Sequence, residues 1–509
     1  MTYLSSVDAD GRVLYCFVTP DGIESPTLHV RPGDTLNVTL TNGLAAPPAG
    51  APRMEMSVVG RPCGDAVMDA SSVNMHFHGT NTSPTCHSDE VIRTLVNSGG
   101  TFRYQVKFPS DEPPGLYWYH PHVHGQAEAA VLGGATGAII VDGLQNIQPE
   151  VAGLPERVLV VRDQIVAGQP MPGGRVPSWD LTLDYVPIAF PAEIPAILRV
   201  KPGRRELWRV VNASADDILD LRLKYDGLDQ QMEVVGLDGV PTGSQDGTGQ
   251  GKSVWTRRLL IPTAGRAEFI VTTPADSVVQ AILVAKRVDV GPAGDNDPTR
   301  TLAVLKQAAA ASGVGMAELP VMPPVDAPPP PPRFASLDGA KITAERNLYF
   351  SEVFEDSRTG RMPTAPHPFG AKSADDGPIQ FYITETHHKP VLFSPDNPPA
   401  ITTTQGAVEA WTIENRTEEV HEFHIHQIHF KLIKRDGVTL PPDQQQYLDT
   451  AQIPFWSGHG PWPSITVLMD FRGPVVGDFV YHCHILEHED GGMMAIIRVN
   501  PKPGAATGS

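Results

Sequence analysis

Three stretches of the chain share one spacing of glycine, apolar residues and asparagine. In RPGDTLNVTLTN, KPGRRELWRVVN and TQGAVEAWTIEN, a glycine precedes an asparagine by nine positions: Gly33 and Asn42, Gly203 and Asn212, Gly406 and Asn415. Apolar residues alternate between the two ends, which predicts a turn, a half-buried strand and a second turn. The separations of 170 and 203 residues favour a β-domain that occurs three times.

The composition also favours an all-β fold. The 509 residues give room for about three domains, and 50 prolines and 47 glycines accompany short β-branched and aromatic segments rather than long amphipathic helices. This profile predicts β-sandwiches or barrels. The proline run in VMPPVDAPPPPPRF predicts an extended segment that does not enter a sheet interior.

We expect three domains separated by one long linker. The predicted domains cover residues 1–145, 150–290 and 340–502. A proline-rich linker is expected at 291–339, with a short helix at 299–312.

Charge and hydropathy exclude some partners. The 39 basic and 58 acidic side chains give a net charge of −19, and no basic run offsets it, so we expect no nucleic-acid partner. No apolar run of about eighteen residues predicts a membrane span. The first eighteen residues lack the basic and apolar pattern of a secretory leader.

Only four cysteines are present, at positions 16, 63, 86 and 483, which is too few for a disulfide scaffold in a chain of this length. Cys63 and Cys86 could form a disulfide, so the cysteines do not decide whether the protein works in an oxidising or a reducing compartment.

Twelve of the eighteen histidines gather in four clusters. These are HFH at 76–78, HPHVH at 120–124, HEFHIHQIH at 421–429 and HCHILEH at 482–488. No histidine lies between His124 and His367. The clusters predict metal sites in the first and third domains and none in the middle domain.

Strand geometry separates two kinds of site. Side chains at i and i+2 share one face of a strand, so each His-X-His pair presents two imidazoles in one direction. In His482-Cys483-His484 the thiol then faces away from its neighbours and serves a different metal. A thiolate, two imidazoles such as His421 and His488, and a thioether from Met493 or Met494 form the ligand set of a blue copper site.

The remaining ligands are imidazoles only. Eight of them are too many for one ion and suit a cluster of about three metals. The cysteine and its two neighbours would join a mononuclear site to this cluster.

Taken together, HFHG, YHPH, HEFHIH and HCHILEHEDGGMM resemble the copper-binding segments of the multicopper oxidases, the family of laccases, bilirubin oxidases, cuprous oxidases and spore-coat oxidases. The resemblance implies three cupredoxin-like Greek-key β-sandwich or barrel domains and four copper ions. It also implies one-electron oxidation of reducing substrates coupled to four-electron reduction of O2 to water.

The resemblance assigns each ligand by position. The type 1 copper would take His421, Cys483, His488 and Met493, with Met494 as the alternative axial ligand. The type 2 copper would take His76 and His424. The two type 3 coppers would take His78, His120, His122, His426, His482 and His484.

Reduction of O2 consumes protons, so carboxylates are expected beside the cluster. Glu489 matches an acidic position in bacterial relatives, and Asp89 is favoured over Glu90 as a second. His124 and His429 are expected near the cluster or at the surface rather than as ligands. For Cys86 and His87 we expect a disulfide or packing cysteine and a surface histidine.

The leading functional hypothesis is a laccase-like oxidase of phenols and aromatic amines. A cuprous oxidase acting on Cu(I) is the first alternative, although the thirteen methionines are scattered rather than gathered in an insertion. A copper nitrite reductase and an electron carrier without oxidase activity need fewer histidines. The family implies a periplasmic or secreted location.

Overall fold

The structure is a computed structural model that describes residues 1–55, 62–168, 172–244, 249–307, 319–328, 336–337, 339–356 and 376–503. Its first domain contains β1 (Thr2–Val7), β2 (Val13–Val18), β3 (Leu28–Val30), β4 (Thr35–Asn42), β5 (Arg53–Glu55), β6 (Cys63–Gly64), β7 (Val67–Asp69), β8 (His76–His78), β9 (Thr94–Leu95), β10 (Thr101–Lys107), β11 (Gly115–His120), α1 (Ala127–Leu132) and β12 (Gly137–Val141). Two 3-10 turns follow, η1 (Leu144–Asn146) and η2 (Pro149–Val151).

The middle domain contains β13 (Glu156–Ile165), β14 (Trp179–Leu183), β15 (Val186–Ile188), β16 (Ala196–Val200), β17 (Arg205–Asn212), β18 (Leu219–Tyr225), β19 (Leu228–Asp229), β20 (Met232–Leu237), β21 (Val240–Pro241), β22 (Val254–Thr256), β23 (Leu259–Ile261), β24 (Arg266–Thr272), β25 (Ala281–Lys286) and β26 (Arg300–Gln307). The third domain contains β27 (Ala344–Asp356), β28 (Asp376–Glu385), β29 (Ile401–Thr404), β30 (Val408–Asn415), β31 (His421–Ile425), β32 (Phe430–Arg435), β33 (Val438–Thr439), η3 (Pro442–Gln444), β34 (Tyr447–Leu448), β35 (Thr450–Ile453), β36 (Ser464–Asp470), β37 (Gly477–Cys483), α2 (Leu486–Asp490) and β38 (Met494–Asn500).

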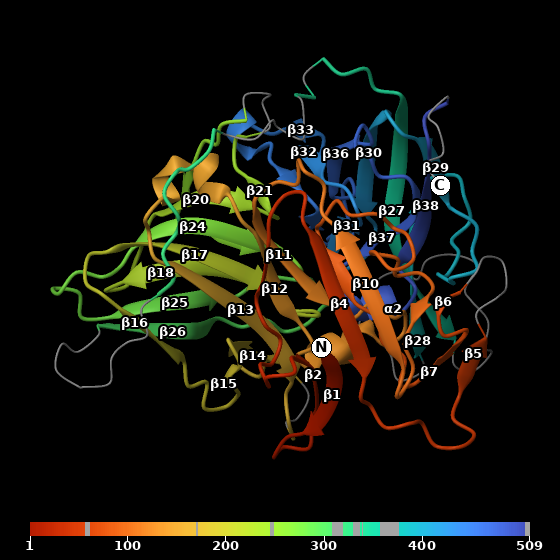
Figure 1. The fold of residues 1–509 in the computed structure, drawn as a ribbon, viewed down its shortest axis with the longest axis horizontal. Coiled ribbons are helices and arrows are strands. Elements are labelled where there is room, and N and C mark those ends of the chain that lie inside the picture. The colour runs from red at the N-terminus through yellow and green to blue at the C-terminus, as the bar shows by residue number, and fades with distance from the viewer. Residues whose placement is uncertain are drawn as a thin grey trace.

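The three domains repeat one arrangement of two packed sheets. One sheet contains β10-β4-β1-β2, and its counterparts are β24-β17-β13-β14 and β36-β30-β27-β28. The other contains β3-β12-β11-β8, and its counterparts are β16-β26-β25-β18 and β29-β38-β37-β31. The predicted all-β fold of three sandwich domains is therefore confirmed, and Figure 1 shows the middle domain, in yellow and green, beside the other two.

The three predicted strands are β4, β17 and β30, which end on Asn42, Asn212 and Asn415. Each asparagine is fully buried, and its side-chain amide donates to backbone carbonyls of two later loops. The shared spacing thus reflects a shared role, because the amide ties the end of a strand to the loops beside it.

The prediction of a helix at residues 299–312 is wrong. The prediction that residues 300–307 belong to a linker is also wrong. Residues 300–307 form β26, which pairs in parallel with β16 and antiparallel with β25. Its counterparts β12 and β38 are the last strands of the outer domains, so the middle sandwich needs β26 to complete its second sheet. Residues 308–312 and residues 329–332 of the proline run lie outside the described residues.

The domains contact one another through apolar side chains. Trp118 of the first domain packs in one cluster with Val211 of the middle domain, and Val91 packs in another with Val480 of the third. Ile218 of the middle domain lies in the core of the third. In the described part of the chain, neither helix is long and apolar enough to cross a membrane.

Candidate metal centre

Two pairs of neighbouring strands carry the clustered histidines. In the first domain β8 pairs with β11, which places His76 opposite His120. In the third domain β31 pairs with β37, which places His424 opposite His482. All four imidazoles are buried.

Strand alternation describes these clusters only in part. His122, His426 and His484 lie just beyond the last residues of β11, β31 and β37. The second histidine of each of these pairs is therefore positioned by the loop that follows the strand.

Histidines of the first and third domains together form three groups that could each hold a metal ion. In each group the candidate ligand atoms lie within 4.8 Å of one another. The groups are His76, His78 and His424; His78, His120 and His484; and His122, His426 and His482. Among the described residues, the middle domain contributes to none of these three groups, so the sites lie where the outer domains meet.

The protonation and hydrogen bonding of these histidines suit metal binding. Burial, with smaller contributions from neighbouring histidines, holds the pKa of His76, His78 and His424 well below the usual range, so the imidazoles are neutral. Several buried ring nitrogens have no hydrogen-bond partner: Nε2 of His76, His120 and His424, Nδ1 of His78, and both nitrogens of His484. Unpartnered lone pairs on buried neutral imidazoles fit copper.

The opposite ring nitrogens are held by the protein. Nδ1 of His76 lies 2.9 Å from Asp89, and Nε2 of His78 lies 3.2 Å from Asp449. Nδ1 of His424 donates to the backbone carbonyl of Asp449 at 2.8 Å. Such contacts fix the orientation of an imidazole and the nitrogen that it offers to a metal.

The two carboxylates predicted from the sequence both lie beside these groups. Asp89 contacts His76 and accepts hydrogen bonds from the backbone of Phe77, at 3.0 Å, and from the side chain of Gln427. Glu489 lies 3.1 Å from Nδ1 of His482 and 3.6 Å from Nε2 of His122.

Burial raises the pKa of both carboxyl groups. Glu90, the less favoured alternative to Asp89, instead binds the backbone of Arg93 and the hydroxyl of Thr94.

The thiol of Cys483 belongs to a separate group, as strand alternation predicted. Its Sγ lies 3.5 Å from Nδ1 of His421 and 3.5 Å from Nδ1 of His488, and these two nitrogens are 3.0 Å apart. The backbone N–H of Glu422 donates to the sulfur at 3.3 Å. One sulfur and two nitrogens converge on one point, while His482 and His484 face the imidazole groups.

The two methionines pack in different places. Met493 is fully buried in the same core as Cys483, and its carbonyl accepts a hydrogen bond from the backbone of Cys483 at 3.1 Å. Met494 packs instead against Val91 and Ile92 of the first domain. Of the two, Met493 remains the better candidate for an axial ligand.

The distal nitrogens of His421 and His488 are covered by polar side chains that the sequence did not reveal. Nε2 of His421 lies 2.8 Å from the Thr417 hydroxyl and 3.1 Å from Glu352, and Nε2 of His488 lies 3.0 Å from Glu419. Burial and the charge of Glu352 raise the pKa of Glu419.

These carboxylates could not be found by spacing, because Glu352 lies 69 residues from its histidine in a different strand. Asp449 and its partner Arg266 were missed for the same reason, since Arg266 comes from the middle domain.

The other conspicuous residues have structural contacts. His429 donates from Nε2 to the carbonyl of Asp238 at 2.8 Å, and the ring of His124 packs on Phe393. Neither belongs to the groups described above.

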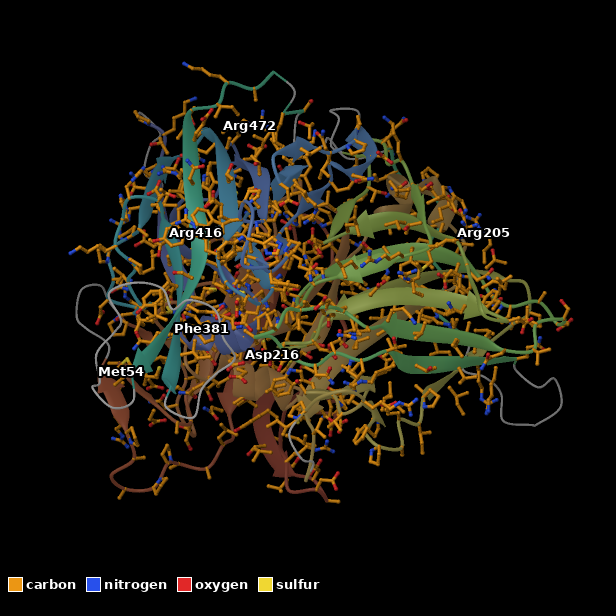
Figure 2. All side chains as sticks on the ribbon, turned by 180° about the vertical axis from the view of Figure 1, so that it is seen from behind. Met54, Arg205, Asp216, Phe381, Arg416 and Arg472 are labelled. Carbon is orange, nitrogen blue, oxygen red and sulfur yellow. A yellow bond between two sulfur atoms is a disulfide. The ribbon has the colours of Figure 1, made fainter. Side chains whose placement is uncertain are left out.

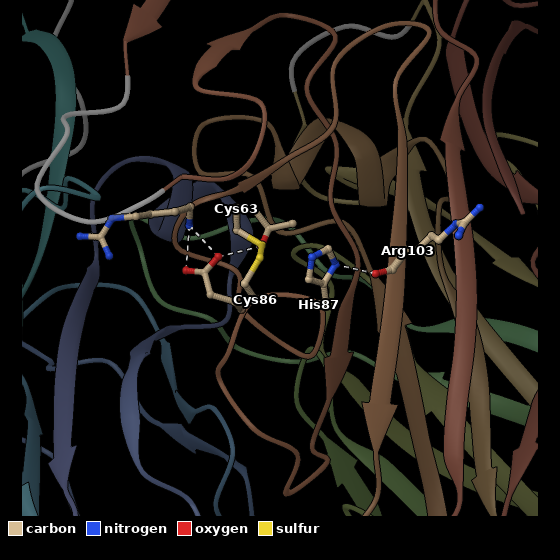
Figure 3. Close-up of a disulfide and its surroundings, with 7 residues drawn as sticks. Cys63, Cys86, His87 and Arg103 are labelled. Atoms are coloured by element: carbon tan, nitrogen blue, oxygen red, sulfur yellow. Dashed lines mark hydrogen bonds between the residues drawn. A yellow bond between two sulfur atoms is a disulfide. The ribbon is translucent and has the colours of Figure 1, made fainter. Parts of the chain in front are cut away.

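Cys86 forms a disulfide with Cys63, and the exposed His87 contacts the carbonyl of Arg103 at 2.8 Å, as Figure 3 shows. The interpretation of Cys86 and His87 as a disulfide cysteine and a surface histidine is therefore confirmed.

The chain matches two family models described as multicopper oxidase, over residues 68–146 and 363–503. A laccase of Haloferax volcanii is 31% identical over 33% of this chain, but the match spans only 26% of that protein's length. Multicopper oxidase mco of Staphylococcus aureus is 22% identical over 93% of this chain and 81% of that protein. A solved multicopper oxidase of Campylobacter jejuni, described as a metallo-oxidase, aligns with a TM-score of 0.64 and 20% identity over 98% of this chain and 90% of that one.

The two model matches include the clustered histidines and Cys483, and the structural similarity extends along almost the whole chain. The chain belongs to the multicopper oxidase family. Multicopper oxidases are oxidoreductases that bind copper and use O2 together with reducing substrates.

Proposed function

We propose that the chain is a laccase-like oxidase that removes single electrons from phenols and aromatic amines and passes them to O2, forming water. The observation that carries this proposal is the convergence of the Cys483 sulfur with Nδ1 of His421 and of His488, at 3.0–3.5 Å. Cys483 is bonded through the backbone to His482 and His484, which belong to the imidazole groups. The chain itself therefore joins the two kinds of site.

In this proposal the sites hold four copper ions. The type 1 ion is held by His421, Cys483, His488 and Met493. The type 2 ion is held by His76 and His424, and the type 3 pair by His78, His120, His122, His426, His482 and His484. Copper supplies reversible one-electron redox chemistry, so that electrons taken singly from a reductant can be delivered together to O2.

Two carboxyl groups would supply protons to the O2 site. Glu489 lies between His122 and His482, and Asp89 lies against His76. Both are buried, so each can hold a proton beside the cluster while bulk water is kept away. Asp89 is also positioned by Gln427, which donates a hydrogen bond to it from the third domain.

The first test is a Cys483→Ser variant of the copper-loaded protein. We expect it to lose the blue absorption and the oxidation of phenols while it keeps a type 2 EPR signal, because the imidazole groups do not include the sulfur. Visible and EPR spectra and O2 uptake with a phenol measure this. A wild-type protein without blue colour, or without O2 uptake with any reductant, would contradict the proposal.

A second candidate is oxidation of a metal ion such as Cu(I), and the carboxylates over the histidines favour it. Glu352 places negative charge beside the distal nitrogen of His421, and the carboxyl group of Glu419 lies beside that of His488, where a cation could bind close to the electron acceptor. O2 uptake with Cu(I) and with a phenol should be followed in parallel in wild-type protein and in Glu419→Gln. A selective loss of turnover with Cu(I) in the variant would support this candidate.

We also propose that the protein works in the periplasm or outside the cell. The disulfide between Cys63 and Cys86 supports this location, because disulfides persist in oxidising compartments.

A further inference from the structure

The imidazole groups are closed to solvent. His76, His424 and His482 are each no more than 1% exposed, and every group combines residues of the first and third domains. Once these domains have docked, an ion that is to fill a group must pass through the surrounding protein. A route for it should therefore be visible in the packing between the two domains.

A small cavity lies between the first and third domains and reaches one of these groups. Its volume of about 20 Å³ is enough for one occupant of the size of a water molecule. Apolar side chains make up most of its surface, and its lining includes Met68, Val91, His122, His124, Val480 and Met494. Because His122 belongs to an imidazole group with His426 and His482, the cavity ends at a candidate metal ligand.

Three side chains offer this cavity ligand atoms that prefer a soft ion. Met68 and His124 belong to the first domain and Met494 to the third. Nδ1 of His124 is buried and has no hydrogen-bond partner in the described part of the chain. Thioether sulfur together with imidazole suits Cu(I), whereas a strongly hydrated divalent ion is poorly accommodated in a small apolar cavity.

A wider cavity leads from the surface to the small one. It has a volume of about 450 Å³, and its lining includes the exposed residues Arg53 and Met54. Met54 is 48% exposed and is labelled in Figure 2 at the edge of the molecule. The side chains of Met68 and Val123 line both cavities, so the two cavities adjoin there.

We propose that Met68, Met494 and His124 form an entry site for Cu(I), through which the imidazole groups are loaded. The proposal rests on the copper ligands proposed above and is independent of the reductant that the protein oxidises. The ion binds the two sulfurs and Nδ1 of His124, and it moves on as its bonds to sulfur break and a bond to His122 forms. Copper stays monovalent in this exchange, so no oxidant or reductant takes part.

The first test measures binding of Ag⁺, which has the charge and softness of Cu(I) but is not oxidised by O2. Copper-loaded protein is freed of excess copper, and Cys16→Ser removes a competing free thiol. Equilibrium dialysis with metal analysis should find one tightly bound Ag⁺ and unchanged copper. Met68→Leu, Met494→Leu and His124→Leu should each weaken its binding about tenfold or more.

Met54→Leu is the matched control for this measurement. Met54 lies opposite Met68 in the pair of β5 and β7, but it does not line the small cavity. Its replacement should leave Ag⁺ binding unchanged. Leucine has nearly the volume of methionine, so these variants keep the packing and remove only the sulfur.

The second test follows copper loading. Copper-free protein is mixed with Cu(I) without air, the reaction is stopped with a Cu(I) chelator at increasing times, and total copper and the blue absorption after aeration are measured. Met68→Leu and Met494→Leu should slow the filling of the imidazole groups about tenfold and reach the wild-type copper content. The blue absorption should appear at the wild-type rate, because His421, Cys483 and His488 do not line the cavity.

Two results would overturn the proposal: Ag⁺ binding that is absent in the wild type or unchanged in Met68→Leu, and equal slowing of both kinds of site. An effect of Met68→Leu on O2 uptake alone would also overturn it, since the cavity would then admit gas rather than metal. If the wild type consumes no O2 with any reductant, the oxidase function fails, while Ag⁺ binding still decides the entry site.

Discussion

Glu489 lies in direct reach of two clustered imidazoles, and neither of its oxygens meets hydrogen-bond geometry with a protein partner. A buried carboxyl group in this position is suited to exchange protons with the proposed O2 site rather than to hold the fold together. At the residue scale, a substitution of Glu489 can distinguish proton supply from a role in stabilising the fold.

We predict that Glu489→Gln slows O2 reduction about 10²-fold or more, because an amide cannot supply a proton. Anaerobic reduction of the blue copper by a phenol should keep its wild-type rate. Stopped-flow absorption measures the reduction, and an oxygen electrode measures O2 uptake. Glu487→Gln, an exposed neighbour, is the control; slowing of both steps in Glu489→Gln would show that the residue is needed for more than proton supply.

A second residue-scale prediction concerns Asp217 in the middle domain. Burial raises the pKa of Asp217 from 3.8 to about 7, with Arg300 opposing the shift and Asp163 adding to it. In the unfolded chain this carboxyl group ionises near its ordinary pKa, while in the folded protein it stays protonated until about pH 7. Its contribution to stability is thus complete at acid pH and is lost as the pH rises toward 7.

Asp217→Asn should remove this dependence. The melting temperature of the variant minus that of the wild type is expected to increase from about pH 4 to about pH 7, by the equivalent of about 1.4 kcal/mol per pH unit at most, and to stay level above that. The exposed Asp276→Asn is the control and should show no such trend. A constant difference across this range would mean that Asp217 is already ionised at acid pH in the folded protein.

The candidate site residues that can be predicted from the sequence are those that lie close together in the chain. The histidine clusters, Cys483 and the preference for Asp89 over Glu90 followed from spacing and from the family motifs. Glu352, Asp449 and Arg266 could not be found in this way, because they are brought to the site by pairing between distant strands and domains.

At the scale of elements, the three buried asparagines show why the repeat was visible. Asn212 donates to the carbonyls of Asp217, Ile261 and Pro262 at 2.9–3.1 Å, and Asn415 makes the corresponding contacts in the third domain. No other side chain of this size offers the same donors and acceptor. The alternating strand before it can be predicted from its pattern, whereas β26 was mistaken for a helix because its two leucines, alanine and valine lack a clear period of two.

We predict that Asn212→Ala lowers the free energy of unfolding by about 2–4 kcal/mol, because several buried carbonyls lose their donor. Copper content should stay at the wild-type value, since the proposed copper ligands all lie in the outer domains. Urea unfolding and metal analysis measure the two quantities. The control is Asn37→Ala, which removes an exposed asparagine from β4, the strand of the first domain that corresponds to β17; it should change the free energy of unfolding little. A similar decrease in both variants would refute the role of the buried amide.

At the scale of the whole molecule, Arg266 connects the three domains. Its Nη1 donates to Asp449 of the third domain at 2.7 Å, and its Nε donates to the carbonyl of Leu116 of the first domain at 3.3 Å. Asp449 in turn contacts His78. The middle domain thus supports the metal centre through a side chain that holds the outer two in place.

Arg266→Lys should destabilise the protein by roughly 3 kcal/mol, because lysine cannot form the paired hydrogen bonds with Asp449. Copper bound by the imidazole groups should fall with it, as judged by metal analysis and the EPR signal, while the blue band is retained. Arg258→Lys, whose side chain is 55% exposed in the same domain, is the control. Parallel loss of both signals would indicate general unfolding instead.

The proposed copper ligands are divided between the domains, and this division has a consequence for the order in which the protein matures. His421, Cys483 and His488 all belong to the third domain, so their site is complete as soon as that domain has folded. Each imidazole group also needs a residue of the first domain, and it exists only after the two have docked. Ions that bind there stabilise the docked arrangement, and tighter binding stabilises it more. Copper loading should therefore begin at the Cys483 group, giving a blue protein whose domains are not yet docked. It should end with binding at the imidazole groups, which docks the domains without adding to the blue absorption.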